Sequence, residues 1–422
     1  MNKFSLNQIA WIKLFEAHNV LEKINKYGSA ALSATQIKMV REPRLMTKFD
    51  HSYQLPPIFS ENNISILPTS RGTYELGRFE IFHKWSNEPN SDLVKVDFPT
   101  HFESLDFDNI TSESIAISCA FVAKIFEDFL EQEVTPTISG RMSSNKFDFT
   151  INNSGFNHQI FVDRAQIEID GGFESTDFLA LIEAKNYLVD DFVIRQLYYP
   201  YRKWKNSISK NIRNIFLTYS NGIFELREYE FSNLFEYNSI NLIKCKRYAA
   251  CNFSINIQSI QQILDSTKTE EDPCGIPFPQ ADSFDRLINL CELLAQDQFL
   301  TKDYITNNYG FDKRQTDYYT NACKYLGFIE NSNQGFVLTE IATRIFKQHI
   351  QLRRKFFIEQ LMRKRVFRDS LIQYLKNAEI PDRNQIIKIM KTNGCLMSES
   401  TYNRRASTVI GWINWIVEQI EI

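Results

Sequence analysis

The stretch 165–185 constrains the fold more than any other, because it predicts two paired strands that carry acidic residues. Its first run, AQIEID, alternates apolar and polar residues, and its second run, FLALIEAK, carries Glu183 and Lys185 on one face. Successive side chains of a strand point to opposite faces of a sheet. We interpret the Gly-Gly pair at 171–172 as the turn between the strands. This pairing places Asp170 beside Glu183.

The predicted convergence of Asp170, Glu183 and Lys185 has a definite chemistry. Carboxylate oxygens are the ligands that Mg²⁺ requires, so Asp170 and Glu183 are the candidate metal ligands, with Glu168 as a possible supporting acid. Such an ion activates water and polarises a phosphoryl oxygen, and a lysine stabilises the charge that develops. The pattern indicates phosphodiester hydrolysis. The alternative is an ordinary solvated hairpin edge, since loose matches of this kind arise by chance.

The order of Ile169-Asp170, twelve intervening residues and Glu183-Ala184-Lys185 resembles the metal site of the PD-(D/E)XK nucleases, with Ile169 in place of the proline. Further stretches resemble type II restriction endonucleases of this superfamily: REPRLMTKFD at 41–50, SILPTSRGTYELGRF at 65–79, IRQLYYPYR at 194–202, IPFPQADSF at 276–284 and STYNRRASTVIGWINWI at 400–416. The resemblance implies an α/β (α+β) fold. It has a restriction-endonuclease-like core, a mixed sheet flanked by helices, and a mostly helical C-terminal part with winged-helix-like units.

The resemblance also implies a carboxylate on the helix that precedes the sheet. The apolar pattern predicts this helix over 113–132, where Glu127 and Glu131 are the candidates because residues four apart share a helix face. A solvent-facing acidic helix end is the alternative for either residue. Gln196, in a helix predicted over 189–204, is a further supporting candidate that can approach a scissile phosphate.

Proline, glycine and charge patterns divide the chain. The segment 266–283 holds three prolines, a glycine and a charge cluster, which is typical of a linker. The predicted parts are an N-terminal α/β region with DNA contacts at 1–110, the nuclease core at 111–265, the linker at 266–282, a winged-helix-like DNA-binding unit at 283–350 and a second helical DNA-binding unit at 351–422.

Arginines are the candidate DNA-binding residues, because their guanidinium groups match phosphates and guanine edges. In the N-terminal region these are Arg41, Arg44 and Arg71, together with Lys48. Surface ion pairs are an equal alternative on chemistry alone, and the resemblance favours DNA.

Two C-terminal helices supply the remaining candidates. Arg314 and Gln315 lie on a predicted recognition helix, and Arg404 and Arg405 lie near the start of the helix predicted over 399–419. The first residues of a recognition helix are those that reach base edges. A basic cluster at 353–368 adds phosphate-binding charge, unless it is a solvated helix face.

The net charge of −3 hides an asymmetry between the parts. Residues 283–422 carry 20 Lys and Arg against 15 Asp and Glu, a balance of +5, whereas the remainder carries 28 against 36, a balance of −8. A basic C-terminal part fits contact with phosphates, which releases counterions.

Other classes of protein are disfavoured. The chain has no run of 18 apolar residues and no signal-peptide pattern at its start, so we expect a cytoplasmic protein without membrane contact. Its seven cysteines form no CxxC pair, and its six histidines are dispersed, which argues against structural zinc and against zinc-dependent nucleases.

The expected function is therefore that of a Mg²⁺-dependent, sequence-specific double-stranded DNA endonuclease of a restriction-modification system. Cutting both strands with one metal site per chain predicts a homodimer, and a cognate DNA methyltransferase is its expected genetic partner. The alternative is a non-catalytic DNA-binding regulatory protein with an inert nuclease-like core. The presence of Asp170, Glu183 and Lys185 together favours the enzyme.

Overall fold

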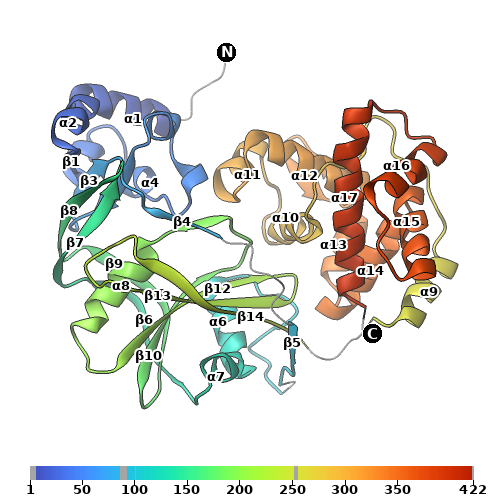
Figure 1. Cartoon of the computed structure of the whole chain (residues 1–422), viewed down its shortest axis with the longest axis horizontal. Coiled ribbons are helices and arrows are strands. Elements are labelled where there is room, and N and C mark those ends of the chain that lie inside the picture. The colour runs from blue at the N-terminus through green and yellow to red at the C-terminus, as the bar shows by residue number, and fades with distance from the viewer. Residues whose placement is uncertain (1–5, 86–92, 100, 251–254, 421–422) are drawn as a thin grey trace.

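The computed structural model describes residues 6–85, 93–99, 101–250 and 255–420. Figure 1 shows an N-terminal part in blue, a β-rich central part in cyan and green, and a helical C-terminal part in orange and red. The fold is mixed α/β with a helical C-terminal region, as predicted. None of the helices in these described ranges has the length and apolar character that a membrane-spanning helix needs.

The N-terminal part packs short helices against a small antiparallel sheet. Its elements are α1 (Leu6–Ala17), α2 (Val20–Tyr27), β1 (Ser29–Ser33), α3 (Ala34–Lys38), α4 (Pro43–Met46), α5 (Pro57–Ser60), β2 (Ser65–Pro68) and β3 (Thr73–Gly77). The sheet order is β1-β3-β2. Ser33 begins α3 through a capping box with Gln36. Trp11 is fully buried and meets Phe59 edge to face, with ring centroids 4.7 Å apart.

A mixed sheet forms the centre of the molecule. Among the described residues it contains seven strands in the order β5-β14-β13-β12-β10-β9-β6. These are β5 (Leu93–Val96), β6 (Thr135–Ser143), β9 (Gln166–Glu174), β10 (Phe178–Lys185), β12 (Asn211–Ser220), β13 (Ile223–Phe231) and β14 (Ile240–Ala250). Strand β10 runs antiparallel to β9 and parallel to β12, so the predicted mixed sheet is confirmed. An Asn221-Gly222 hairpin joins β12 to β13, with positive φ at both residues.

Helices cover both faces of this sheet. Helices α6 (Glu113–Val122) and α7 (Ile125–Leu130) pack on one face, and α8 (Arg195–Lys205) packs on the other. Every residue of β10 is consequently buried. Two antiparallel pairs of the central part stand outside the sheet. One joins β4 (Phe82–Lys84) to the distant β11 (Asp191–Val193), and the other is the hairpin of β7 (Lys146–Asn153) and β8 (Phe156–Asp163).

The interpretation of Gly171-Gly172 as a turn is wrong. Both glycines lie inside β9, and residues 175–177 connect this strand to β10. A Cβ on Gly172 would lie 2.9 Å from Cβ of Ile138 on β6, and one on Gly171 would lie 3.3 Å from Ile117 of α6. The glycines therefore allow a close approach of neighbouring elements.

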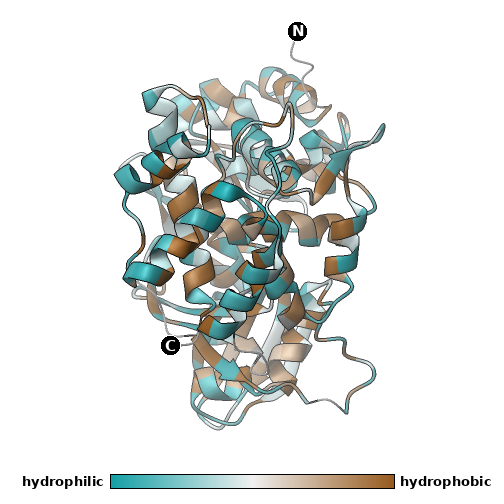
Figure 2. Cartoon of the chain, turned by 90° about the vertical axis from the view of Figure 1, so that its right-hand side faces the viewer, coloured by the Kyte–Doolittle hydropathy of each residue, from teal (hydrophilic) through white to brown (hydrophobic). Residues whose placement is uncertain are grey.

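The C-terminal part is built from helices and one short hairpin. Its elements are α9 (Ile257–Ser266), α10 (Phe284–Gln296), α11 (Lys302–Asn308), α12 (Lys313–Tyr325), β15 (Ile329–Asn331), β16 (Phe336–Leu338), α13 (Glu340–Phe346), α14 (Ile350–Met362), α15 (Arg365–Asn377), α16 (Arg383–Thr392) and α17 (Glu399–Glu418). Figure 2 shows hydrophobic and hydrophilic stretches alternating along these helices, which fits packing through one face.

The structure divides the chain differently from the sequence. Strands β4 and β5, expected in the region 1–110, pair with strands of the central part. The C-terminal hydrophobic core runs from Ile255 to Ile420, so the units expected at 283–350 and 351–422 share it. The expected linker 266–282 is packed: Phe278 stacks on Phe367 with centroids 5.7 Å apart.

Candidate active site

Asp170 and Glu183 lie side by side where β9 and β10 pair. The antiparallel register sets Gly171 opposite Ile182. Asp170, just before Gly171, and Glu183, just after Ile182, are therefore neighbours, as predicted. The backbone N–H of Ala184 donates to Oδ2 of Asp170 at 2.9 Å. This bond fixes the Asp170 carboxylate against the backbone between Glu183 and Lys185.

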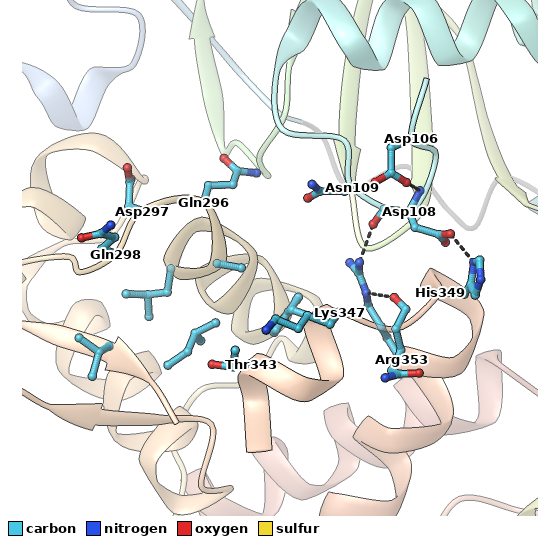
Figure 3. A pocket seen from close by; sticks show the side chains of 16 residues that line it. Asp106, Asp108, Asn109, Gln296, Asp297, Gln298, Thr343, Lys347, His349 and Arg353 are labelled. Atoms are coloured by element: carbon cyan, nitrogen blue, oxygen red, sulfur yellow. Dashed lines mark hydrogen bonds and ion pairs between the residues drawn. The ribbon is translucent and has the colours of Figure 1, made fainter. Parts of the chain in front are cut away.

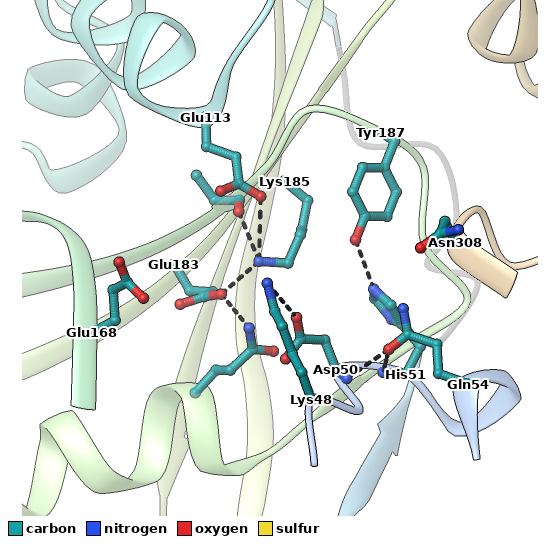
Figure 4. A network of polar contacts seen from close by, with 12 residues as sticks. Lys48, Asp50, His51, Gln54, Glu113, Glu168, Glu183, Lys185, Tyr187 and Asn308 are labelled. Carbon is teal, nitrogen blue, oxygen red and sulfur yellow. Dashed lines mark hydrogen bonds and ion pairs between the residues drawn. The ribbon is translucent and has the colours of Figure 1, made fainter. Parts of the chain in front are cut away.

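Lys185 lies among oxygen atoms. Its Nζ donates to Oε1 of Glu183 at 2.6 Å and to the carbonyl of Ala184 at 3.0 Å, and it lies 3.4 Å from Oε1 of Glu113. Figure 4 shows these contacts. The residue is 5% exposed. The ammonium group thus neutralises an acidic cluster that is largely closed to solvent.

Of the expected supporting residues, Gln196 is at the site and Glu168 is at its edge. Gln196 stands in the first turn of α8, and its Nε2 donates to Oε1 of Glu183. Glu168 is exposed, and its Oε1 accepts from Nε of Arg141 at 3.0 Å. Gln196 therefore orients a site carboxylate, whereas Glu168 forms a surface ion pair.

The carboxylate that a helix brings to Lys185 is that of Glu113, whereas the expected Glu127 and Glu131 form ion pairs elsewhere. The helix predicted over 113–132 breaks at Lys124, which has φ of 58°, and continues as α7. Glu127 pairs with Lys124 at 3.5 Å, and Glu131 pairs with Lys244 at 2.5 Å. The break carries both residues away from β10, and the first turn of α6 supplies Glu113 to Lys185 instead.

The N-terminal part adds residues that sequence reasoning did not place at the site. Figure 4 shows Lys48 and Asp50 beside Lys185, on the loop that follows α4. Lys48 Nζ lies 3.6 Å from Oδ2 of Asp50. Asp50 ends the REPRLMTKFD stretch that carries part of the family resemblance, which is the one signal pointing to it. Its approach to Lys185 depends on a long-range contact that periodicity does not reveal.

Burial and mutual repulsion shape the electrostatics of this cluster. Burial and the charge of Asp170 outweigh the attraction of Lys185 and raise the pKa of Glu183 to about 8. Burial likewise raises the pKa of Asp170 and of Glu113. Although burial opposes it, the charges of Glu183 and Glu113 hold the pKa of Lys185 well above its usual value. A cluster of this kind favours bound cations.

The donor set suits a hard divalent cation. Asp170 and Glu183 present carboxylate oxygens, which are the ligands that Mg²⁺ prefers. Within the described residues, no three acidic, histidine or cysteine side chains already gather around one point. The Lys185 ammonium lies between Glu183 and Glu113 and satisfies their charge in this arrangement. The carboxylates of Asp170 and Glu183 are of the chemical kind that Mg²⁺ prefers, and in this arrangement Lys185 is the cation beside them.

The expected DNA-binding residues are spread over the N-terminal and helical parts. Arg44 and Arg71 are exposed, and Arg41 is partly buried. Arg314 on α12 is exposed and lies over the ring of Tyr318, 6.0 Å from its centroid. Gln315 is engaged in a capping box, where its Oε1 accepts from the N–H of Asp312 at 3.1 Å.

The two arginines of α17 differ in their surroundings. Arg404 is exposed, whereas Arg405 is partly buried. Burial and the neighbouring charge of Arg404 lower the pKa of Arg405, and Tyr318 of α12 lies close enough to oppose that shift. Of the two arginines, Arg404 is therefore the one open to solvent, and Arg405 is the one shielded by its neighbours.

The basic cluster at 353–368 serves the fold, so its interpretation as phosphate-binding charge is wrong for the arginines that are tied internally. Arg353 Nε donates to the carbonyl of Gln348 at 2.9 Å, and Arg368 Nη1 donates to that of Thr267 at 2.9 Å. Arg363 pairs with Glu270. Arg363 and Arg368 thus join the helical part to the packed segment before α10, and Arg353 fixes the turn before its own helix.

A cavity of about 620 Å³ lies elsewhere, between the central and helical parts. Figure 3 shows polar residues around it, with Asp108 contacting His349 and Arg353. The N–H of Ile350 also donates to Asp108 at 2.8 Å, which caps the start of α14. Its lining includes neither Asp170 nor Glu183, so this is a junction between parts of the chain.

Comparison with known proteins finds similarity to domains of unknown function. Residues 8–76 match the model of the domain of unknown function DUF6996, residues 77–249 that of DUF6997 and residues 286–421 that of DUF7226. No curated protein and no solved structure matches the chain. The acidic cluster draws on the first two matched regions, since Asp50 lies in one and Glu183 in the other.

Proposed function

We propose that the chain is a Mg²⁺-dependent double-stranded DNA endonuclease of the PD-(D/E)XK restriction type. The observation that carries this proposal is the meeting of Asp170, Glu183 and Lys185 at the paired ends of β9 and β10. The mixed sheet flanked by helices supports it, because this is the core that the family resemblance implies.

Asp170 and Glu183 would hold the ion. When bound there, Mg²⁺ lowers the pKa of a coordinated water and stabilises charge on phosphoryl oxygens. Gln196 holds the Glu183 carboxylate in place through the bond to its Oε1. Lys185 supplies a fixed positive charge for the transition state, since the surrounding carboxylates keep it protonated.

The helical part is the proposed reader of DNA. Helices α10, α11 and α12 precede the β15–β16 hairpin, and Leu300 bridges to Phe336 beside it. This order supports a winged-helix interpretation in which α12 is the recognition helix and presents Arg314. Arg404, exposed near the start of α17, is a second proposed DNA contact of this part.

Double-strand cleavage by one site per chain is most simply achieved by a homodimer, which we propose for the DNA-bound state. A cognate DNA methyltransferase would protect the host DNA in a restriction-modification system. Sedimentation of the protein with duplex DNA tests the dimer, and a complex with one chain per duplex would contradict it.

Incubation of plasmid and phage DNA with the purified chain tests the function. We expect discrete fragments with Mg²⁺ and intact DNA with EDTA, and sequencing of the fragment ends would then identify the target. Retarded but uncut DNA would favour the alternative of a non-catalytic DNA-binding protein. If the chain neither cuts nor retards the DNA, the endonuclease function and the DNA-binding alternative are both contradicted.

A further inference from the structure

The loop 48–54 of the N-terminal part is fastened to the central part beside the acidic cluster. The N–H of Val193 donates to the carbonyl of Asp50 at 2.8 Å. The N–H of Ser52 donates to Oδ1 of Asp191 at 3.1 Å, and Asp191 is buried. A buried carboxylate that accepts from a loop backbone fixes the loop strongly, because breaking the bond would leave the charge unpaired.

Aromatic residues fasten the same loop from two further sides. His51 is fully buried, and its Nε2 lies 3.0 Å from the hydroxyl of Tyr187, two residues beyond Lys185. Tyr53 stacks on His51 with centroids 5.2 Å apart, and its hydroxyl donates to the carbonyl of Asn308 at the end of α11 at 3.2 Å. Figure 4 shows His51 beside the hydroxyl of Tyr187. The loop is therefore held at a junction of all three matched regions.

This fastening presents two side chains of opposite character at the site. The Asp50 side chain is 13% exposed, and the Lys48 side chain is 78% exposed. Although burial opposes it, the charges of Lys185 and Lys48 hold the pKa of Asp50 below its usual value. Asp50 is thus a charged acid that faces the site, and Lys48 extends past it toward solvent.

An exposed lysine, Lys48, lies beside the acidic residues of the site. Asp50, Glu113 and Asp170 would repel a DNA phosphate, and Lys185 is buried beside them. Lys48 is exposed, lies near Asp50, and contributes to the electrostatics of Glu113. An exposed ion pair of this kind contributes little to stability, so it leaves Lys48 available to bind a phosphate.

We propose that the N-terminal part completes the cleavage site, with Lys48 binding a DNA phosphate beside the scissile bond and Asp50 positioning Lys48. This inference rests on the proposed endonuclease function. It assigns the region matched by DUF6996 a direct part in the reaction. Lys48 would contact substrate, whereas Asp50 acts through Lys48.

The test measures binding of the full chain to a duplex fragment of plasmid DNA in EDTA at several salt concentrations. Loss of one phosphate contact lowers the slope of log Kd against log salt concentration by about 0.9. We expect this reduction for Lys48→Ala, a retained slope for Lys48→Arg, and no change for Lys13→Ala, an exposed lysine on α1. Unfolding temperatures should be equal, because Lys48 is exposed.

Cleavage kinetics test the positioning residue. Asp50→Asn should lower kcat more than it raises KM, and Asp50→Glu should restore part of kcat, because a carboxylate again holds the lysine. A parental salt slope and parental kinetics for Lys48→Ala would overturn the inference. If the parent cuts no DNA, the endonuclease function fails, while the salt slope still decides whether Lys48 binds phosphate.

Discussion

Lys185 Nζ lies 3.4 Å from Oε1 of Glu113, so the first turn of α6 and strand β10 share one buried ammonium group. The same nitrogen donates to Glu183 at 2.6 Å. Glu113 therefore divides the charge of Lys185 with a proposed metal ligand. The start of α6 is therefore part of the site, whereas Glu127 and Glu131, on and just after α7, are not.

Replacing Glu113 should impair cleavage, whereas replacing Glu127 should not. Glu113→Gln removes one of the two carboxylates that hold Lys185, so we expect a fall in kcat of roughly ten- to a hundredfold, as for other residues that orient a site group. Glu127→Gln is the matched control, because Glu127 pairs with Lys124 after the helix break. Steady-state cleavage of plasmid DNA measures both. Equal activity of the two variants would remove Glu113 from the site.

The pKa of Glu183 predicts how stability depends on pH without metal. Its pKa of about 8 in the folded protein lies above its ordinary value of 4.5. Between these two pH values the folded protein therefore keeps a proton that the unfolded chain has released. The free energy of unfolding should fall as pH rises through this window, and less steeply in Glu183→Gln. Thermal unfolding in EDTA from pH 5 to pH 8 checks this. Parallel curves for the two proteins would contradict it.

The two arginines of α17 should have separable effects. Arg404 is exposed, so Arg404→Ala should relax the cleaved sequence, losing about 1–3 kcal/mol of discrimination if the arginine reads guanine. Arg405 is partly buried near Tyr318, so Arg405→Ala should mainly lower the unfolding temperature. Fragment-end sequencing and thermal unfolding distinguish the outcomes. If neither variant changes cleavage or binding, the N-terminal Arg41, Arg44 and Arg71 become the leading readers.

The glycines of β9 should tolerate no side chain. Gly172→Ala places Cβ 2.9 Å from Cβ of Ile138, and overpacking of this kind costs about 1–3 kcal/mol of stability. Gly72→Ala is the control, because no atom lies within 4 Å of its added Cβ. Denaturant unfolding measures both. An unchanged midpoint for Gly172→Ala would show that β6 and β9 can separate without cost.

The central acidic pair could be predicted because its information is local. Alternation along the two runs identifies their polar residues, and the register of β9 and β10 sets Asp170 beside Glu183 although Gly171 and Gly172 are not the turn. Strand period alone does not distinguish a glycine that turns the chain from one that admits a neighbour.

The remaining site residues depend on contacts between distant segments. Glu113 lies at the site, and Glu127 and Glu131 do not, because the helix breaks at Lys124, which adopts a left-handed conformation. An apolar helical pattern does not predict this break. Asp50 reaches the site through a loop held by Asp191, far along the chain. In the basic cluster at 353–368, charged residues that the sequence predicts at the surface instead donate to backbone carbonyls within the fold.

Cleavage by metal-ligand variants tests the central claim most directly. Asp170→Asn and Glu183→Gln keep the shape of the side chains and remove their charge, so we expect at least about a hundredfold loss of Mg²⁺-dependent cleavage. Duplex binding should be kept or strengthened, because a negative charge near phosphate is lost. The measurement compares fragment yield and Kd for each variant and the parent. Substantial Mg²⁺-dependent cutting by either variant would contradict the proposed active site.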